Sequence, residues 1–340
     1  MPNTPRFWGV IPPLPAKALG QVARSAEDMG LEGLWGIQLY GPPFAPLAAA
    51  AMVTDSIKLG TGVAQAFVRS PLETACAALE LDIINGGRTV LGIGPTLRWW
   101  NEDWHGVRYG KPIPHLREAV EVIRMIISRG HTGELGKWKG EYYTLNLDRF
   151  QTLYAPVRED IPIYLPALFE TASRVAGEIA DGLAGHPIWC EQWIMNQVKT
   201  NVAKGLNKAG KERSGFDLNI WLYVAPGPDK KQCIEDARRT VAFYSSFSQY
   251  ERYFSECGFG DAARAIAQAA EAKDDVGMLN ACTDAMVENF SLVGPIDEVR
   301  ARVGRIAQIA DSFTLCAPFQ GLAQEQVGEY NQCIAEVFYG

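Results

Sequence analysis

The sequence is poor in the residues on which disulfide frameworks and metal sites are built. Its seven cysteines are an odd, widely scattered set without a Cys-x-x-Cys pair: Cys76, Cys190, Cys233, Cys257, Cys282, Cys316 and Cys333. This pattern favours reduced, mostly buried thiols over disulfides or a zinc site. Only four histidines are present, and no His-x-x-x-His spacing links them, so no metal is expected.

The sequence also lacks an excess of positive charge and a long apolar run. Its formal net charge is −7, which leaves no broad basic face for nucleic acid or for an anionic membrane. The longest nearly apolar run, residues 42–53, is too short to span a bilayer. The first fifteen residues have no basic segment followed by an apolar core. We therefore expect a cytoplasmic protein whose partners are small molecules.

What is present is a repeating alternation of short strand-like runs with segments of helical period. Eight runs are predicted to be strands: residues 7–10, 33–39, 57–64, 89–94, 161–167, 183–187, 219–226 and 312–318. Each is followed by a helix, which favours an α/β fold of the (β/α)8 TIM-barrel type. No linker divides residues 1–340, so we predict a single domain, with insertions at about 131–160 and 228–289, after the fourth and seventh strands.

In such a barrel, chemistry takes place at the mouth formed by the carboxyl ends of the strands. The residues that end the eight predicted strands include very few Asp, Glu, Lys or His. This composition disfavours metal-assisted, Schiff-base and two-carboxylate mechanisms, which need such groups in the mouth. An apolar mouth suits a flat aromatic cofactor that brings its own reactivity.

Two glycine motifs follow predicted strands. GIGPT, residues 92–96, lacks the third glycine of a dinucleotide fingerprint and is followed by Trp99 and Trp100, so a nicotinamide site is not expected. We interpret it as a strand end where the backbone approaches a ligand or, alternatively, a neighbouring strand. KLGTGVAQAF, residues 58–67, predicts a bulge that supports a planar ring, or else an irregular strand exit without a ligand.

Four further features lie near the predicted mouth. His105, with Glu102 beside it, could form an acid/base pair or simply be solvated. His186 follows the sixth strand and could contact an anionic ligand. Glu170 opens the helix after the fifth strand, whose amino terminus could hold a phosphate, or it only complements the helix dipole. The aromatic segment at residues 241–259 could cover the mouth or pack within its own insertion.

Taken in order, six segments resemble the luciferase-like flavin and deazaflavin oxidoreductases, particularly the branch that depends on coenzyme F420. They are ARSAEDMGLEGLW (23–35), TDSIKLGTGVAQAFVRSPLETACAALELDIINGGRTVLGIG (54–94), WHGVRYGKPIPHLREAVEVIR (104–124), GEYYTL (140–145), IPIYLPAL with AGEIADG (161–182), and LVGPIDEVRARV (292–303). The resemblance implies a (β/α)8 barrel, a homodimer, and a nonprolyl cis peptide in the bulge after the third strand. In this sequence that bulge would lie within Ala64, Gln65 and Ala66.

The sequence departs from this family at three strand ends. Gln38 and Leu39 stand where members that oxidise alcohols have Asp-His, and Ile11 stands where many have glutamate. Phe169, Glu170 and Thr171 replace the Gly-Pro-Lys that many members have after the fifth strand. The usual proton-handling histidine is therefore absent, which disfavours alcohol oxidation.

The resemblance implies hydride transfer from reduced F420 to an electron-poor substrate such as an enone or imine. Alternatives are a monooxygenase that uses reduced FMN and a non-catalytic flavin-binding barrel. Catalytic candidates are His105 and Glu102. The expected cofactor contacts are Gln38, Ala64, Gln65, Ala66 and Asn101 around the ring, and Ala167, Leu168, Phe169 and His186 around the tail. The insertions contain no pattern that identifies the substrate.

Overall fold

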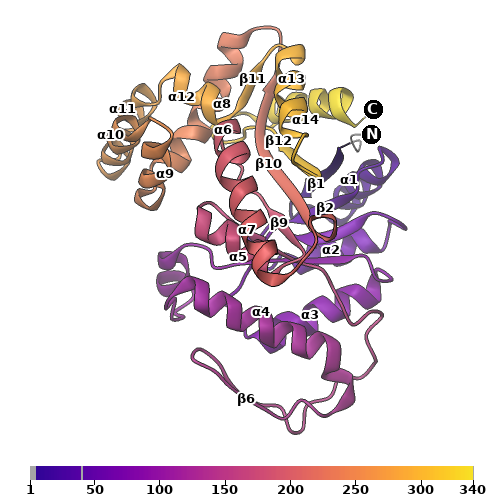
Figure 1. Cartoon of the computed structure of the whole chain (residues 1–340). Coiled ribbons are helices and arrows are strands. Elements are labelled where there is room, and N and C mark those ends of the chain that lie inside the picture. Colours follow the sequence, from indigo (N-terminus) through magenta and orange to yellow (C-terminus); the bar gives the residue numbers. More distant parts are fainter. Residues whose placement is uncertain (1–4, 40, 340) are drawn as a thin grey trace.

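A computed structural model describes residues 5–39 and 41–339 as parallel strands alternating with helices (Figure 1). Eight strands form the barrel wall: β1 (Arg6–Ile11), β2 (Gly33–Gly36), β3 (Lys58–Thr61), β5 (Thr89–Gly94), β8 (Ile163–Pro166), β9 (Gly182–Ala184), β10 (Asp217–Pro226) and β12 (Ser312–Cys316). Each pairs in parallel with its neighbours, and the ring closes because β12 pairs with both β1 and β10. The predicted (β/α)8 barrel is confirmed.

Helices follow the strands and surround the barrel. They are α1 (Ala16–Asp28), α2 (Phe44–Ala51), α3 (Pro71–Ile84), α4 (Pro112–Arg129), α5 (Glu170–Ile179), α6 (Glu191–Trp193), α7 (Lys199–Ala209), α8 (Lys230–Ser245), α9 (Glu251–Glu256), α10 (Gly260–Glu271), α11 (Asp275–Ala281), α12 (Asp284–Phe290), α13 (Ile296–Ile306) and α14 (Gln324–Phe338). Side chains cap the starts of α3, α8, α11 and α12. At α3 the Ser70 hydroxyl accepts a hydrogen bond from the Glu73 backbone N–H at 3.1 Å, and Pro71 takes the first position.

Large aromatic side chains fill the barrel interior. The rings of Trp8 and Trp35 stack with centroids 4.1 Å apart, and Trp221 and Tyr164 complete the cluster with Val90. The glycines of neighbouring strands make room for these rings. A Cβ added at Gly33 would overlap the Trp8 ring, and one at Gly60 would overlap the Trp35 ring.

The Gly-x-Gly of β5 also serves neighbouring strands. A Cβ at Gly92 would overlap the backbone carbonyl of Thr61, and one at Gly94 would overlap the Pro166 ring. The alternative interpretation of this motif, that its glycines let the backbone approach a neighbouring strand, is therefore confirmed at both positions. Adjacent strands can approach closely at this end of the barrel because these two positions have no side chain.

The amino-terminal end of the barrel contains a network of ion pairs. Arg6 lies 2.6 Å from Asp217, and Lys58 lies 2.7 Å from Glu32. Glu32 also accepts a hydrogen bond from Trp8 Nε1 at 3.0 Å, which joins the network to the interior cluster. These charged groups are ion-paired with one another, so we look for the functional mouth at the opposite, carboxyl end of the strands.

Two segments stand outside the regular alternation. A small hairpin, β6 (Lys137–Lys139) with β7 (Thr144–Asn146), lies below α4 in Figure 1 and is held by Glu118, which accepts hydrogen bonds from the Tyr142 and Tyr143 backbone N–H groups. Helices α8 to α12 form a helical segment at one side of the barrel (Figure 1), as the pattern at 228–289 predicts. The short strand β11 (Leu292–Gly294), which pairs with the end of β10, was not expected.

The irregular exit after β3 contains a nonprolyl cis peptide bond between Gly62 and Val63. This bond was expected within Ala64, Gln65 and Ala66. There the structure instead forms the short strand β4 (Ala64–Gln65), which pairs with β5. The bulge therefore begins earlier than expected, directly after β3. Among the helices of the described residues, none is both long enough and apolar enough to cross a membrane.

Candidate active site

The floor of the barrel mouth follows from the alternation of side chains along the strands. Trp8, Trp35, Tyr164 and Trp221 point inward, so the residues two positions further along their strands also point inward. On β12, inward Thr314 bonds Trp35 Nε1 at 3.1 Å, which makes Cys316 inward as well. On β9, Gly182 faces the Tyr164 ring, which gives His186 the same orientation. The resulting floor consists of Val10, Ile37, Pro166, His186, Tyr223 and Cys316.

One half of the mouth, around β2, β4 and β5, is lined by amides. Gln38 Oε1 accepts hydrogen bonds from the Gln65 backbone N–H at 3.0 Å and from Arg69 Nη2 at 2.7 Å. Gln65 is only 1% exposed, and both polar atoms of its side chain lack a hydrogen-bond partner among the described residues. Asn101 is fully buried, and its Nδ2 bonds the carbonyls of Pro95 and Leu97, while its Oδ1 has no partner within residues 5–39 and 41–339. Arg69 was not expected here, because no motif marks it.

The other half of the mouth contains an imidazole and phenol hydroxyls. His186 Nε2 lies 3.3 Å from the Tyr250 hydroxyl, and the His186 ring meets the rings of Tyr244 and Tyr250 edge to face. The Tyr223 and Tyr244 hydroxyls are 3.1 Å apart. Burial disfavours the charged form of both groups: it lowers the pKa of His186 to about 3 and raises the pKa of Tyr244 to about 12. At neutral pH the imidazole is therefore neutral and the phenol is protonated.

These tyrosines come from two different sources. Tyr223 lies on the inward face of β10, within the predicted strand at residues 219–226. Tyr244 and Tyr250 belong to the aromatic segment at 241–259, and they show that part of this segment does cover the mouth. Phe254 and Phe259 of the same segment pack instead against Phe290, within the helical segment. Both interpretations of the aromatic stripe therefore apply, to different residues.

The rim beyond β5 is a π-helical turn, Trp100–Trp104, where the rings of Trp100 and Trp104 stack 5.0 Å apart. Glu102 and His105 are exposed on this turn, and Glu102 is ion-paired with Arg98 at 2.9 Å. Before the turn, Thr96 has φ 58°, a conformation that is strained for a β-branched residue. Such strain is typical of functional sites.

The exit of β8 brings together the residues expected at the cofactor tail. Ala167 is buried, and the Leu168 carbonyl accepts hydrogen bonds from the indole N–H groups of Trp189 and Trp193, both at 3.1 Å. Phe169 precedes α5, and the Arg252 guanidinium lies 5.1 Å from the centre of its ring. Glu170, at the first position of α5, is ion-paired with the same arginine. The helix amino terminus is thus partly covered by α9.

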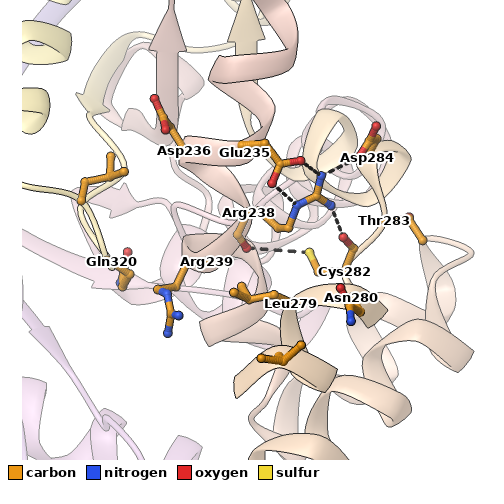
Figure 2. A pocket seen from close by; sticks show the side chains of 13 residues that line it. Glu235, Asp236, Arg238, Arg239, Leu279, Asn280, Cys282, Thr283, Asp284 and Gln320 are labelled. Atoms are coloured by element: carbon orange, nitrogen blue, oxygen red, sulfur yellow. Dashed lines mark hydrogen bonds and ion pairs between the residues drawn. The ribbon is translucent and has the colours of Figure 1, made fainter. Parts of the chain in front are cut away.

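A separate cavity of about 680 Å³ lies between α8, α11 and the loop at residues 320–322. Figure 2 shows Arg238 in this cavity between Glu235 and Asp284, with dashed lines to both and to the Cys282 carbonyl. Arg239 is paired with Asp275 at 3.2 Å. Both arginines of the cavity are thus already paired with carboxylates, so we place the candidate active site at the barrel mouth. Within the described residues, no cluster of His, Cys, Asp and Glu is suited to a metal ion.

The mouth fits a flat heteroaromatic cofactor with donors and acceptors along its edge. The unpartnered amide of Gln65 and the Oδ1 of Asn101 are buried polar groups, which are costly unless something bonds them. Ala64 and Ala66, next to Gln65 in the chain, are small and buried, so their side chains leave space for a planar ring. Among the expected ring contacts, Gln38 is joined directly to Gln65, while Asn101 lies in the π-helical turn.

Comparison with known proteins identifies the family. Residues 3–312 match the family described as luciferase-like monooxygenase. The chain is 31% identical over 307 residues to a 5,10-methylenetetrahydromethanopterin reductase of Archaeoglobus fulgidus, covering 88% of each chain. It is 26% identical over 317 residues to a putative coenzyme F420-dependent oxidoreductase of Mycobacterium tuberculosis, covering 87% of this chain and 88% of the relative.

A solved structure supports the fold. The coenzyme F420 dependent tetrahydromethanopterin reductase from Methanopyrus kandleri superposes with a TM-score of 0.81 at 23% identity, covering 97% of both chains. The family match spans most of the sequence, and the barrel mouth has the composition that a bound redox cofactor needs. This chain belongs to the luciferase-like monooxygenase family and is an enzyme.

Proposed function

We propose that this enzyme is a coenzyme F420-dependent oxidoreductase that reduces an electron-poor double bond, of the enone or imine type. The observation that supports the proposal most is the division of the mouth into an amide-lined half, which also contains Arg69, and a hydroxyl-lined half. Such a mouth positions a cofactor and a substrate but supplies no strong nucleophile of its own. The names of the relatives, which include an F420-dependent oxidoreductase, favour a deazaflavin.

The amide half would hold the cofactor ring. Gln38, Gln65 and Asn101 would bond its edge, with Ala64 and Ala66 against its face. Ala167, Leu168, Phe169 and His186 would contact the tail or the end of the ring nearest to it. When bound, the reduced deazaflavin supplies a hydride, while the protein orients both reactants and excludes water.

Reduction of a double bond also needs a proton, for which the sequence predicted His105 and Glu102. These two residues remain candidates, although Glu102 is already paired with Arg98. The geometry adds Tyr250 as a third candidate. His186 Nδ1 accepts the Ile188 N–H at 3.4 Å, which leaves the proton on Nε2, pointing toward the Tyr250 oxygen. That N–H would stabilise negative charge developing on Tyr250 as its hydrogen passes to the substrate.

This function can be tested anaerobically with reduced F420 and 2-cyclohexen-1-one as the enone. We expect oxidised deazaflavin to form together with cyclohexanone. Tyr250→Phe should lower kcat by about 100-fold, the usual scale of general-acid catalysis, without changing the dissociation constant of F420. Glu102→Gln and His105→Gln serve as matched variants. A larger loss of kcat in either of them than in Tyr250→Phe would identify that residue as the proton donor instead.

The two rival functions make different predictions. A monooxygenase that uses reduced FMN would consume oxygen in proportion to product. A non-catalytic flavin binder would bind the cofactor yet turn over no enone, imine or alcohol, and Gln38→Ala would alter only its affinity. Our proposal requires oxygen-independent turnover.

We also propose a cytoplasmic homodimer in which residues 1–340 form a single domain, with residues 131–160 and 228–289 as its insertions. The resemblance to the family supports the dimer, and sedimentation velocity at micromolar concentration would measure it. A mass corresponding to one chain would contradict it.

A further inference from the structure

Two cysteines from distant parts of the chain meet beside the mouth. Cys190 follows the exit of β9, four residues after His186, and Cys257 ends α9. Their sulfur atoms are 3.7 Å apart, so a small movement would bring them to bonding distance. Cys190 is 3% exposed, whereas Cys257 is partly open to solvent. Neither residue belongs to the candidate active site described above.

The surroundings of Cys190 stabilise a thiolate. The Cys257 thiol donates to the Cys190 sulfur, and although burial opposes ionisation, the Trp193 backbone N–H and the Asn289 amide add further hydrogen bonds. Together these hydrogen bonds lower the pKa of Cys190, and the contact between the two sulfurs raises the pKa of Cys257. One sulfur is thus prepared as the nucleophile, and the other remains a protonated neighbour.

Two other cysteines, Cys282 and Cys316, lack these features. Burial raises the pKa of both Cys282 and Cys316 to about 12, and neither has a second sulfur as a described hydrogen-bond partner. They remain neutral thiols at physiological pH and serve as internal controls for the reactivity of the pair.

We propose that Cys190 and Cys257 are a redox-active dithiol that hydrogen peroxide converts to a reversible disulfide. The Cys190 thiolate attacks one peroxide oxygen, breaks the O–O bond and becomes a sulfenic acid, while the other oxygen takes up a proton and leaves as water. The Cys257 sulfur then attacks the sulfenic sulfur, and its proton leaves with the hydroxyl as a second water. Overall two thiols are oxidised and one peroxide is reduced. A dithiol reductant reverses the reaction.

The disulfide would join α9 to the strand exit that contains His186. Tyr253 already links these parts, since its hydroxyl donates to the Ile188 carbonyl at 2.9 Å and accepts the Cys190 N–H at 2.8 Å. A covalent bond between residues 190 and 257 would fix the helical segment on this side of the mouth.

The test treats the folded, reduced protein with a small excess of hydrogen peroxide, followed by alkylation and trypsin digestion. Residues 175–199 and 253–264 are single-cysteine tryptic peptides, so the bond appears as one cross-linked species in the mass spectrum. We expect the number of free thiols per chain to fall from seven to five, because one disulfide consumes two of them. Dithiothreitol should restore it, and Cys282 and Cys316 should stay reduced.

Two variants separate the roles of the sulfurs. Cys257→Ser should leave Cys190 as a sulfenic acid that dimedone traps, whereas Cys190→Ser should leave Cys257 unmodified under the same conditions. Circular dichroism of each protein confirms that it is folded. The proposal is wrong if the folded wild-type protein forms no cross-link between the two peptides, or if Cys282 and Cys316 are oxidised at the same rate as Cys190.

Discussion

At the scale of single residues, glycine positions decide whether the aromatic interior of the barrel can form. Gly60 on β3 lies against the Trp35 ring, and a Cβ there would overlap it. We expect Gly60→Ala to lower the free energy of unfolding by at least about 2 kcal/mol, because the stacked indoles have no space to move apart. Gly304 on α13 has nothing within 4 Å of its added Cβ and is exposed.

The matched variant Gly304→Ala should therefore be neutral or stabilise the protein by about 0.5–1 kcal/mol, since alanine favours helix. Urea unfolding of both variants gives the comparison. Equal effects at the two positions would show that the Gly60 site can relax, and that the Trp35 packing is looser than the structure indicates.

At the scale of elements, one carboxylate holds the last turn of α1 against the loop before β3. Glu27 accepts hydrogen bonds from the backbone N–H groups of Asp55, Ser56 and Ile57. Burial alone would raise its pKa, but these bonds and the Ser56 hydroxyl outweigh that effect and lower the pKa from 4.5 to about 2. The stabilisation is complete above pH 4.5 and is lost as the pH falls toward 2.

We predict that Glu27→Gln lowers the free energy of unfolding at pH 7 by about 1–2 kcal/mol, because hydrogen bonds to a charged acceptor are replaced by weaker ones. The difference from the wild type should shrink between pH 4.5 and pH 2. Asp28→Asn, at the exposed neighbouring position, is the control and should change little. A deficit that persists unchanged at low pH would contradict the assigned charge on Glu27.

The elements themselves were largely predictable from the sequence, for identifiable reasons. Buried parallel strands appear as apolar runs between turn residues, so β5 was predicted with the observed bounds. Strand β11 has only three residues, and its partner is the far end of β10, a long-range pairing that no local pattern encodes. The π-helical turn at Trp100–Trp104 was missed because its aromatic spacing is also that of an irregular loop.

The candidate site was less predictable, because it depends on which side chains meet across the mouth. His186 was found from its position after a strand. Its partner Tyr250 lies 64 residues further along the chain, in an aromatic stripe that also contains purely structural residues. Arg69 follows β4 with no motif at all. Sequence position identifies strand ends well, but it does not specify partners from a distant helical segment.

At the scale of the whole molecule, the helical segment shares its core with the barrel. Phe254 and Phe290 belong to the same hydrophobic cluster as Leu91 and Leu222 of the barrel wall. We therefore expect one cooperative transition in calorimetry, with equal calorimetric and van't Hoff enthalpies. Two separated transitions would show that residues 228–289 unfold independently and that the chain is not a single domain.

The central claim is that the barrel mouth binds a deazaflavin and uses it without oxygen. The most direct measurement is a fluorescence titration of the purified enzyme with F420 and with FMN, combined with oxygen uptake in the presence of each reduced cofactor. We predict that F420 binds at least about tenfold more tightly, a difference of about 1.4 kcal/mol, and that no oxygen is consumed during turnover. Tighter binding of FMN with oxygen uptake coupled to product would contradict the account.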